Sequence, residues 1–271
     1  MALTDYIRPL YRVLKKRAKS ATAVINSYKY RNSIARNHSS HEYVANLLVV
    51  KKPIYAQLAK LCAESFLFYN PKCQVIVNVD EATESAVSRA FGKLRKKRNI
   101  EIRNIGENAD SWQDIKLRVI FEMREPNEFF MDADLRWNGP IPKLDGLTFF
   151  VNEFKLKDNP PYSKLLESSG WHSNREFTMK NTSFLFWGDY KPMASDLSFI
   201  DQAMGKIQDL CDQGLIPSED AVSIIRISEQ IALSALVDVK NQEVNFLKKV
   251  DGYRDGSFVE SSYFGATGSA F

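Results

Sequence analysis

The sequence predicts an α/β fold in which a mainly parallel sheet is flanked by helices. Short apolar runs alternate with segments of helical periodicity through the first half of the chain, and this alternation is typical of parallel sheets with helical crossovers. The chain has 271 residues, of which 44% are hydrophobic, enough for one large core. We therefore expect one domain over residues 41–271, preceded by a basic helical extension over residues 1–40.

The expected elements follow one another in a regular order. Strands are short apolar runs bounded by turn residues, and helices carry apolar residues every three or four positions. We expect strands at Tyr43–Val50, Gln74–Val79, Ile100–Ile105, Phe129–Leu135, Thr148–Phe154 and Asn181–Trp187. We expect helices at Pro53–Phe68, Thr83–Arg98, Ser111–Met123 and Ser218–Val237. In such sheets ligands bind beyond the carboxyl ends of the strands.

The composition is that of a folded globular protein. Charged residues make up 26% of the chain, and the hydrophobic fraction is too high for a disordered chain. The three cysteines (Cys62, Cys73 and Cys211) are too few and too widely spaced to suggest a disulfide framework or a zinc site. The sequence shows neither a long apolar stretch nor a secretory signal. We therefore expect a cytoplasmic protein.

Positive charge is concentrated near the start of the chain. Residues 1–60 carry twelve Lys and Arg against two acidic residues, although the whole chain has a net charge of +4. Leu3, Ile7, Leu10 and Leu14 recur at helical spacing among these basic residues, which predicts a basic amphipathic helix. This helix either packs on its own domain or contacts an anionic membrane through residues 1–20, at the inner membrane face. The basic segments lack interleaved aromatic residues, so we expect no nucleic-acid partner.

An Asp-x-Asp motif follows the expected strand that begins at Phe129. Asp132 and Asp134 are two positions apart, and in an extended chain such side chains point the same way. Two carboxylates suit Mg²⁺ or Mn²⁺, which take further oxygen ligands from a diphosphate. The alternative interpretation is a solvated strand end or a helix N-cap.

A series of further features accompanies this motif. They are the strand that ends at Asp80, the helix Trp112–Arg118, the Asp-x-Asp motif itself, the turn-like segment Asn138–Leu144, the strand Asn181–Phe186 and the helix start Ser228–Leu233. In this order the features resemble those of GT-A glycosyltransferases, particularly the glycosyltransferase family 8-like, sugar-nucleotide-dependent group. The segment Asn138–Leu144 is similar to the family's turn and helix after its Asp-x-Asp. The resemblance spans about residues 43–265.

The resemblance implies transfer of a sugar from a nucleoside-diphosphate sugar to an acceptor hydroxyl on a glycan or a lipid-linked glycan. Asp132 and Asp134 would hold Mn²⁺ or Mg²⁺, and Asp132 would also approach the ribose or the donor sugar. Glu229 would lie beneath the donor, as a base for the acceptor hydroxyl or as a stabiliser of an oxocarbenium-like centre. Its alternative role is that of a helix N-terminal Glu that interacts only with the helix dipole.

The resemblance also implies a set of donor-binding residues. They are Val49, Val50, Lys51, Asp80, Lys116, Arg118 and Asp132. The end of the first strand would lie beside the nucleotide base, and Asp80 would either line the same edge or serve only in the turn after its strand. Lys116 or Arg118 would contact phosphate or the donor sugar, unless they form a solvated helix face. On the acceptor side the candidates are Trp137, Trp171, His172 and Glu153.

The chain departs from the family pattern at three places. The first strand ends in Val49-Val50-Lys51-Lys52 where the family has an acidic residue, and Ser262 or Tyr263 stands where it has a metal-binding His. Asn181-Thr182-Ser183 lacks the family's Gly. These differences leave open a catalytically silent relative that acts as a binding or assembly module. A nucleotidyltransferase is the other alternative, although Val50–Pro53 is not its glycine-rich phosphate loop.

Overall fold

A computed structural model describes residues 42–96, 98–106, 111–123, 125–137 and 139–247, together with the backbone of Val259–Ser261. The basic helix expected within residues 1–40, and Ser262 and Tyr263, lie outside the described residues. In the part of the chain that is described, no helix is long and apolar enough to cross a membrane.

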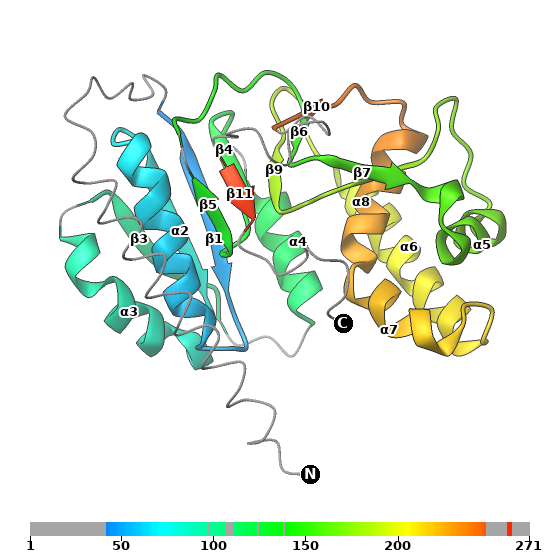
Figure 1. Ribbon diagram of the computed structural model, residues 1–271, viewed down its shortest axis with the longest axis horizontal. Helices are drawn as coiled ribbons and strands as arrows, with labels where there is room; N and C mark the ends of the chain where they lie inside the picture. Colours follow the sequence, from blue (N-terminus) through cyan, green and yellow to red (C-terminus); the bar gives the residue numbers. More distant parts are fainter. Residues whose placement is uncertain are drawn as a thin grey trace, which may run out of the picture.

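The fold is α/β, as the sequence predicts. The main sheet has seven strands in the order β10-β6-β9-β4-β1-β2-β3 (Figure 1). Four of them run parallel and form one half of the sheet, namely β1 (Val44–Val49), β2 (Gln74–Val79), β3 (Ile100–Asn104) and β4 (Glu128–Met131). The other half consists of β6 (Thr148–Phe149), β9 (Phe184–Phe186) and β10 (Asn245–Phe246). β9 pairs antiparallel with both β4 and β6.

Helices cover both faces of the parallel half. Alternate side chains of β1 point to opposite faces. Leu47 belongs to the core cluster that includes buried residues of both α2 (Tyr55–Tyr69) and α3 (Glu81–Arg95). Leu48 packs instead against the core that contains α4 (Trp112–Glu122). The region at the carboxyl ends of β1 and β4 therefore lies between helices of both layers.

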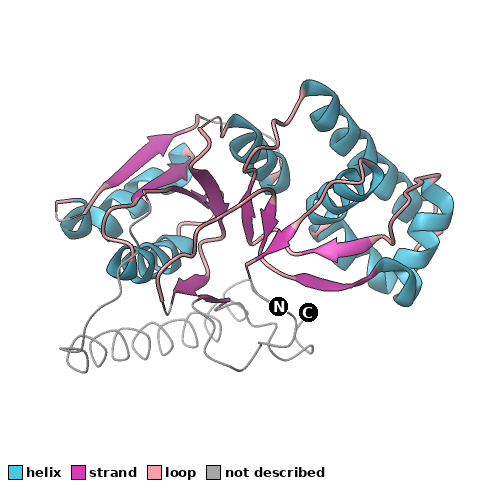
Figure 2. Ribbon diagram, turned by 90° about the horizontal axis from the view of Figure 1, so that it is seen from above, coloured by secondary structure: helices cyan, strands magenta, loops and turns pink. Residues whose placement is uncertain are grey.

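The second half of the chain is mainly helical. Figures 1 and 2 show its helices gathered at one end of the molecule, away from α2 and α3. They are α5 (Pro160–Ser169), α6 (Ala194–Asp212), α7 (Ser218–Arg226) and α8 (Ser228–Val239), with the short 3-10 helix η1 (Leu156–Asp158) before α5. β7 (Asn152–Lys155) pairs antiparallel with β8 (Thr178–Lys180). α8 is buried over all of its length except its last residue, because it packs between α6 and β8.

Three expected elements prove to be interrupted. The strand expected over Phe129–Leu135 ends at Met131, and a turn leads to β5 (Leu135–Trp137), which pairs with β11 (Val259–Ser261) instead of with the main sheet. The strand expected over Thr148–Phe154 is likewise divided between β6 and β7. The helix expected over Ser218–Val237 breaks at Ile227, where surface helix α7 gives way to buried helix α8.

The helix that the family resemblance suggests after the Asp-x-Asp motif is absent, since residues 139–147 contain neither helix nor strand. Side chains from other elements take up backbone groups of this segment. The Ile141 N–H donates to Asn70 Oδ1 at 2.8 Å, and the Leu144 N–H donates to the Tyr43 hydroxyl at 2.8 Å. These bonds satisfy the backbone without a helix.

Candidate active site

Lys116 is the centre of the candidate site. It lies on α4, whose start is fixed by a capping box in which the side chains of Ser111 and Asp114 each accept a backbone N–H of the other. α4 leads from β3 to β4, so its N-terminus lies at the carboxyl edge of the parallel strands. The Lys116 side chain is only 3% exposed.

Three segments that are far apart in sequence meet at the Lys116 ammonium. Its Nζ lies 3.3 Å from Asp132 Oδ1 and 3.6 Å from Glu229 Oε1, and it donates to Thr182 Oγ1 at 3.2 Å. Asp132 follows β4, Thr182 precedes β9, and Glu229 lies in the first turn of α8. We call these four residues the Lys116 cluster. The structure thus brings together Lys116, Asp132 and Glu229, three residues that the sequence predicts separately as site candidates.

The cluster is electrostatically unusual because most of it is buried. Burial opposes the charge of Lys116, but the carboxylates of Asp132 and Glu229 outweigh this effect, so the pKa of Lys116 is raised. Burial raises the pKa of Glu229 from its ordinary value, although the charge of Lys116 opposes this shift. Glu229 Oε2 is buried and has no hydrogen-bond partner. An unsatisfied buried oxygen is costly, and a bound water, ion or ligand is one way to satisfy it.

The two aspartates lie in a turn, not in a continuous strand. The Asp132 N–H donates to the Ser183 carbonyl at 2.7 Å, and the Leu135 N–H donates to the Asp132 carbonyl at 3.2 Å. Asp132 and Asp134 therefore do not lie in the extended strand that the sequence predicts, although the two carboxylates are still neighbours. Burial, together with the charge of Asp132, raises the pKa of Asp134 to about 7.

The donor set fits a cation that is shared with a ligand. Within the described residues there is no group of three or more His, Cys, Asp or Glu that could hold a metal ion. Asp132 and Asp134 supply two carboxylates, and the Asp132 side chain is 31% exposed. Mg²⁺ and Mn²⁺ sites often use one or two carboxylates and complete their shell with substrate phosphates and water. The residues therefore suit this kind of site, not a closed site made of protein ligands alone.

A second polar group adjoins the cluster along the chain. Glu153, on β7, accepts hydrogen bonds from Asn181 Nδ2 at 2.6 Å and from Gln230 Nε2 at 3.1 Å. Asn181 precedes Thr182, and Gln230 follows Glu229, so this group continues the Lys116 cluster through two peptide links. Loss of solvation raises the pKa of Glu153, and the two amide hydrogen bonds oppose that shift. The sequence predicts a role for Glu153 and places Asn181 in a segment that resembles a family motif. Only the structure shows that Asn181 and Gln230 both donate to Glu153.

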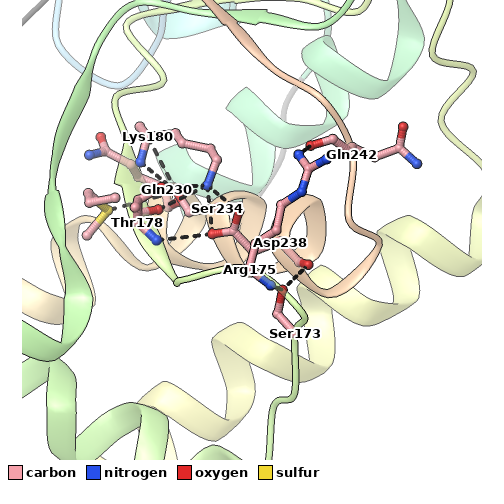
Figure 3. A network of polar contacts seen from close by, with 9 residues as sticks. Ser173, Arg175, Thr178, Lys180, Gln230, Ser234, Asp238 and Gln242 are labelled. Carbon is pink, nitrogen blue, oxygen red and sulfur yellow. Dashed lines mark hydrogen bonds and ion pairs between the residues drawn. The ribbon is translucent and has the colours of Figure 1, made fainter.

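A buried ion pair connects α8 to β8, the strand that immediately precedes Asn181 and Thr182. Lys180 Nζ lies 2.7 Å from both carboxylate oxygens of Asp238, and the Lys180 N–H donates to Ser234 Oγ at 2.9 Å. Figure 3 shows this network between β8 and α8. Burial lowers the pKa of Lys180, although Asp238 favours its charged form. The ion pair fixes the position of α8, and with it Glu229, relative to Thr182.

Asp80 has a structural role at the end of β2. Its Oδ1 accepts from the Thr83 N–H at 3.0 Å, which caps α3, and also from the Thr83 hydroxyl at 2.7 Å. Its Oδ2 accepts from the Lys51 N–H at 2.7 Å, where Lys51 adopts a positive φ of 62°. This arrangement supports the interpretation of Asp80 as a strand-end turn residue. Val49 and Val50, before Lys51, are buried.

Several other candidates lie apart from the Lys116 cluster. Arg118 donates to the Ile105 carbonyl at 3.1 Å, beyond β3. Trp137 is 1% exposed and packs against the ring of Phe66, so the prediction that it contacts a ligand is wrong. Trp171 and His172 line a surface cavity of about 390 Å³. The cavity lies toward the C-terminal end of α8, where Ser173 Oγ donates to the Asp238 carbonyl.

Sequence reasoning missed two residues of the site. Thr182 contacts Lys116 but stands in a segment identified only by its resemblance to a family motif. Trp112 is 41% exposed, and its ring centroid lies 5.8 Å from Lys116 Nζ. The spacing of Trp112 and Lys116, four residues apart on an expected helix, is a signal that could have placed both on one face.

Comparisons with known proteins complete this description. No protein-family model matches the sequence, and no curated protein matches it. Solved structures that resemble the chain include several glycosyltransferases. The galactosyltransferase LgtC, in complex with donor and acceptor sugar analogs, is 13% identical over 71% of this chain and 70% of that chain, with a TM-score of 0.49. Mouse xyloside xylosyltransferase 1 is 11% identical over 76% and 85%, with a TM-score of 0.43.

A third similar structure is the mannosyltransferase PcManGT from Pyrobaculum calidifontis, in complex with GDP-Man and Mn²⁺. It is 12% identical over 84% of each chain, with a TM-score of 0.32. The three TM-scores lie below 0.5, so the function proposed below rests on the contacts within this chain.

Proposed function

We propose that this protein is a GT-A type glycosyltransferase that moves a sugar from a nucleoside-diphosphate sugar to an acceptor hydroxyl. The observation that supports this most strongly is the Lys116 cluster. It joins an ammonium, an Asp-x-Asp turn and a buried carboxylate with an unpartnered oxygen at the carboxyl edge of a parallel sheet. That edge is where α/β sheets bind their ligands.

The diphosphate of the donor would bind at Asp132, Asp134 and Lys116. The two carboxylates would hold Mn²⁺ or Mg²⁺ together with phosphate oxygens. Such a cation supplies neutralisation of the negative charge that develops on the leaving diphosphate. The ammonium of Lys116, 3.3 Å from Asp132, would add a second positive charge beside the same group.

Glu229 is the carboxylate that we assign to the reacting sugar. Oε1 lies 3.6 Å from the Lys116 ammonium, and this charge favours the ionised form against the effect of burial. Oε2 is left to accept a hydrogen bond from a ligand. Glu229 would take the proton of the acceptor hydroxyl or stabilise positive charge on the sugar carbon. Both roles need the ionised carboxylate.

The neighbouring group of Glu153, Asn181 and Gln230 would bind sugar hydroxyls. It presents amide and carboxylate groups that both donate and accept hydrogen bonds, as hydroxyl recognition requires. On the donor side, Val49, Val50 and Lys51 would face the base through their backbone. Arg118 donates to the Ile105 carbonyl at 3.1 Å, and the other N–H donors of its guanidinium would contact phosphate or the donor sugar.

The acceptor in this proposal is a glycan or a lipid-linked glycan. The basic residues within 1–20 would hold the enzyme at the inner face of a cytoplasmic membrane. Co-sedimentation with anionic liposomes, measured for the full chain and for a variant lacking residues 2–20, tests this part. Binding that is unchanged by the deletion would rule out membrane contact through this segment.

The decisive experiment measures donor binding and donor hydrolysis together. A thermal-shift panel of nucleoside diphosphates and nucleotide sugars, each with Mn²⁺, Mg²⁺ or EDTA, should show metal-dependent stabilisation by one nucleotide. A ligand at 100 times its dissociation constant adds about 2.7 kcal/mol of stability. Asp134→Ala should abolish the metal dependence, and Glu229→Gln should slow sugar transfer by about 10²–10⁴-fold with donor binding retained.

The alternative of a catalytically silent binding module has one specific observation in its favour, the ion pair between Lys116 and Asp132. In that case the Lys116 ammonium would permanently take the place of the divalent cation. Nucleotide binding without metal dependence and without hydrolysis would establish this alternative and overturn the transferase.

A further inference from the structure

Trp112 stands out among the tryptophans because its ring is left in contact with water. It is 41% exposed, whereas Trp137 and Trp187 are 1% and 5% exposed. A large aromatic side chain that stays exposed gives up the stabilisation of burial, and tryptophan is enriched at interfaces, where one part of the ring is apolar and the N–H is polar.

The ring lies at the rim of the candidate site. Trp112 and Lys116 are four residues apart on α4, so they share one face of the helix. The Lys116 Nζ is 5.8 Å from the Trp112 ring centroid and also contacts Asp132 and Glu229. Because α4 begins at the carboxyl edge of the sheet, Trp112 lies one helical turn farther out than Lys116.

The backbone on both sides of Trp112 is anchored. Ser111 and Asp114 form the capping box that begins α4. The Gln113 side chain donates to the Ile225 carbonyl at 3.2 Å, which ties this turn to α7. The backbone beneath the indole is therefore ordered before a ligand binds, and a ligand does not have to order it.

We propose that Trp112 stacks against a pyranose ring of the substrate and helps to determine which sugar is accepted. This inference rests on the transferase function proposed above. The C–H face of a pyranose is apolar and flat enough to pack on an indole, while its hydroxyls reach the charged groups behind the ring. The ring comes from the donor sugar or from the acceptor sugar, and both present the same chemistry to Trp112.

Fluorine NMR of the full chain labelled with 5-fluorotryptophan tests the contact directly. The chain has four tryptophans, so the Trp112 signal is assigned by its loss in Trp112→Phe. The probes are methyl glycosides of glucose, galactose, mannose and N-acetylglucosamine, the nucleotide sugars of the same sugars, and the nucleoside diphosphates alone, with Mn²⁺. We expect the Trp112 signal to move with a sugar-bearing probe and to stay in place with the matching nucleoside diphosphate.

The probes distinguish a donor sugar from an acceptor sugar. They also test the stacking role of Trp112 separately from the transferase function. A shift caused by a methyl glycoside identifies the acceptor ring, and a shift caused only by a nucleotide sugar identifies the donor ring. A sugar-bearing probe that binds, as seen by thermal shift, without moving the Trp112 signal overturns the stacking role alone. A shift caused by the nucleoside diphosphate alone assigns Trp112 to the nucleotide and also overturns it. Binding of no probe overturns the transferase, and the stacking role falls with it.

Variants add a quantitative readout. Trp112→Leu should weaken binding of the sugar-bearing probe at least tenfold, and Trp112→Phe should recover most of that loss because it keeps an aromatic face. Affinity for the nucleoside diphosphate should not change in either variant. Leu215→Ala, at an exposed apolar side chain beyond the end of α6, is the control and should leave all affinities unchanged. Equal losses in Trp112→Leu and Trp112→Phe would contradict stacking.

Discussion

The Lys116 ammonium lies 3.3 Å from Asp132 Oδ1 and 3.6 Å from Glu229 Oε1, so one buried cation joins the Asp-x-Asp turn to the first turn of α8. The ion pair to Glu229 is the more deeply buried of the two, since both side chains are 3% exposed. The charge of Lys116 therefore favours the ionised form of Glu229 against the effect of burial, and removing either charge should have measurable consequences.

Replacing Lys116 by Met should destabilise the protein by about 3–5 kcal/mol at neutral pH, because it leaves the Glu229 carboxylate buried without the ion-pair partner that it has among the described residues. The loss should grow as the pH rises. The pKa of Glu229, already raised by burial, rises further without Lys116, and the protonated form that the variant needs becomes scarce at high pH. Urea unfolding at several pH values measures this effect.

The double variant Lys116→Met/Glu229→Gln is the control for that experiment. It has neither charge, so its loss should be smaller than the sum of the two single losses by about 0.5–3 kcal/mol. Strict additivity would mean that Lys116 and Glu229 do not interact energetically.

Cation binding should depend on pH through Asp134. Burial and the charge of Asp132 raise the pKa of Asp134 to about 7, so below that pH a divalent cation must displace a proton. We expect Mn²⁺ affinity to rise about tenfold per pH unit up to about pH 7 and then to level off. Calorimetric titration of Mn²⁺ across this range measures the slope.

Asp134→Asn serves as the matched control, because it has no proton to displace. Its residual Mn²⁺ affinity should not follow the wild-type slope. Without metal, this variant should gain stability relative to the wild type as the pH rises from about 4 to about 7, since a raised carboxyl pKa costs stability over that window. An identical pH slope in both proteins would exclude Asp134 as the titrating ligand.

Asp80→Ala should lower the free energy of unfolding by about 0.5–2 kcal/mol, the usual cost of losing a helix N-cap. Both carboxylate oxygens of Asp80 are taken by Thr83 and Lys51, so we expect the KM for the nucleotide sugar to change little. Asp80→Asn retains one accepting oxygen and should cost less than Asp80→Ala. A hundredfold loss of nucleotide affinity in a stably folded Asp80→Asn would show that Asp80 contacts the donor.

The parallel half of the sheet was predictable because its strands are short apolar runs with clear boundaries. β2, for example, occupies the predicted residues Gln74–Val79 without a shift. Lys116, Asp132 and Glu229 were also named from the sequence, since each stands at a position of the family pattern. Their mutual contact was not predictable, because it depends on how α8 packs against the strands before it.

The second half was less predictable, for identifiable reasons. α6 carries Ile200, Ala203, Ile207 and Leu210 at helical spacing, but polar residues between them obscure the pattern. α5 begins at Pro160 and is not among the helices expected from the sequence. The sequence predicts that Trp137, beside the Asp-x-Asp motif, contacts a ligand. The chain turns at Asp132, however, and the Trp137 ring lies in the core.

The buried pair of Lys180 and Asp238 should be needed for catalysis only through the position of α8. Lys180→Met should cost about 3–5 kcal/mol of stability, since it leaves the Asp238 carboxylate buried without its partner. Lys180→Met/Asp238→Asn removes both charges and keeps an oxygen for the Thr178 N–H, so it should recover much of that loss.

The double variant then separates stability from function. With its fold restored but without the ion pair between β8 and α8, it should hold Glu229 less firmly against Lys116. We expect kcat for sugar transfer to fall while the KM for the donor stays close to that of the wild type, because the proposed diphosphate ligands lie in the turn after β4 and on α4. A parallel fall of kcat in Lys180→Met and in the restored double variant would confirm a positioning role. Full recovery of kcat along with stability would show that the pair only stabilises the fold.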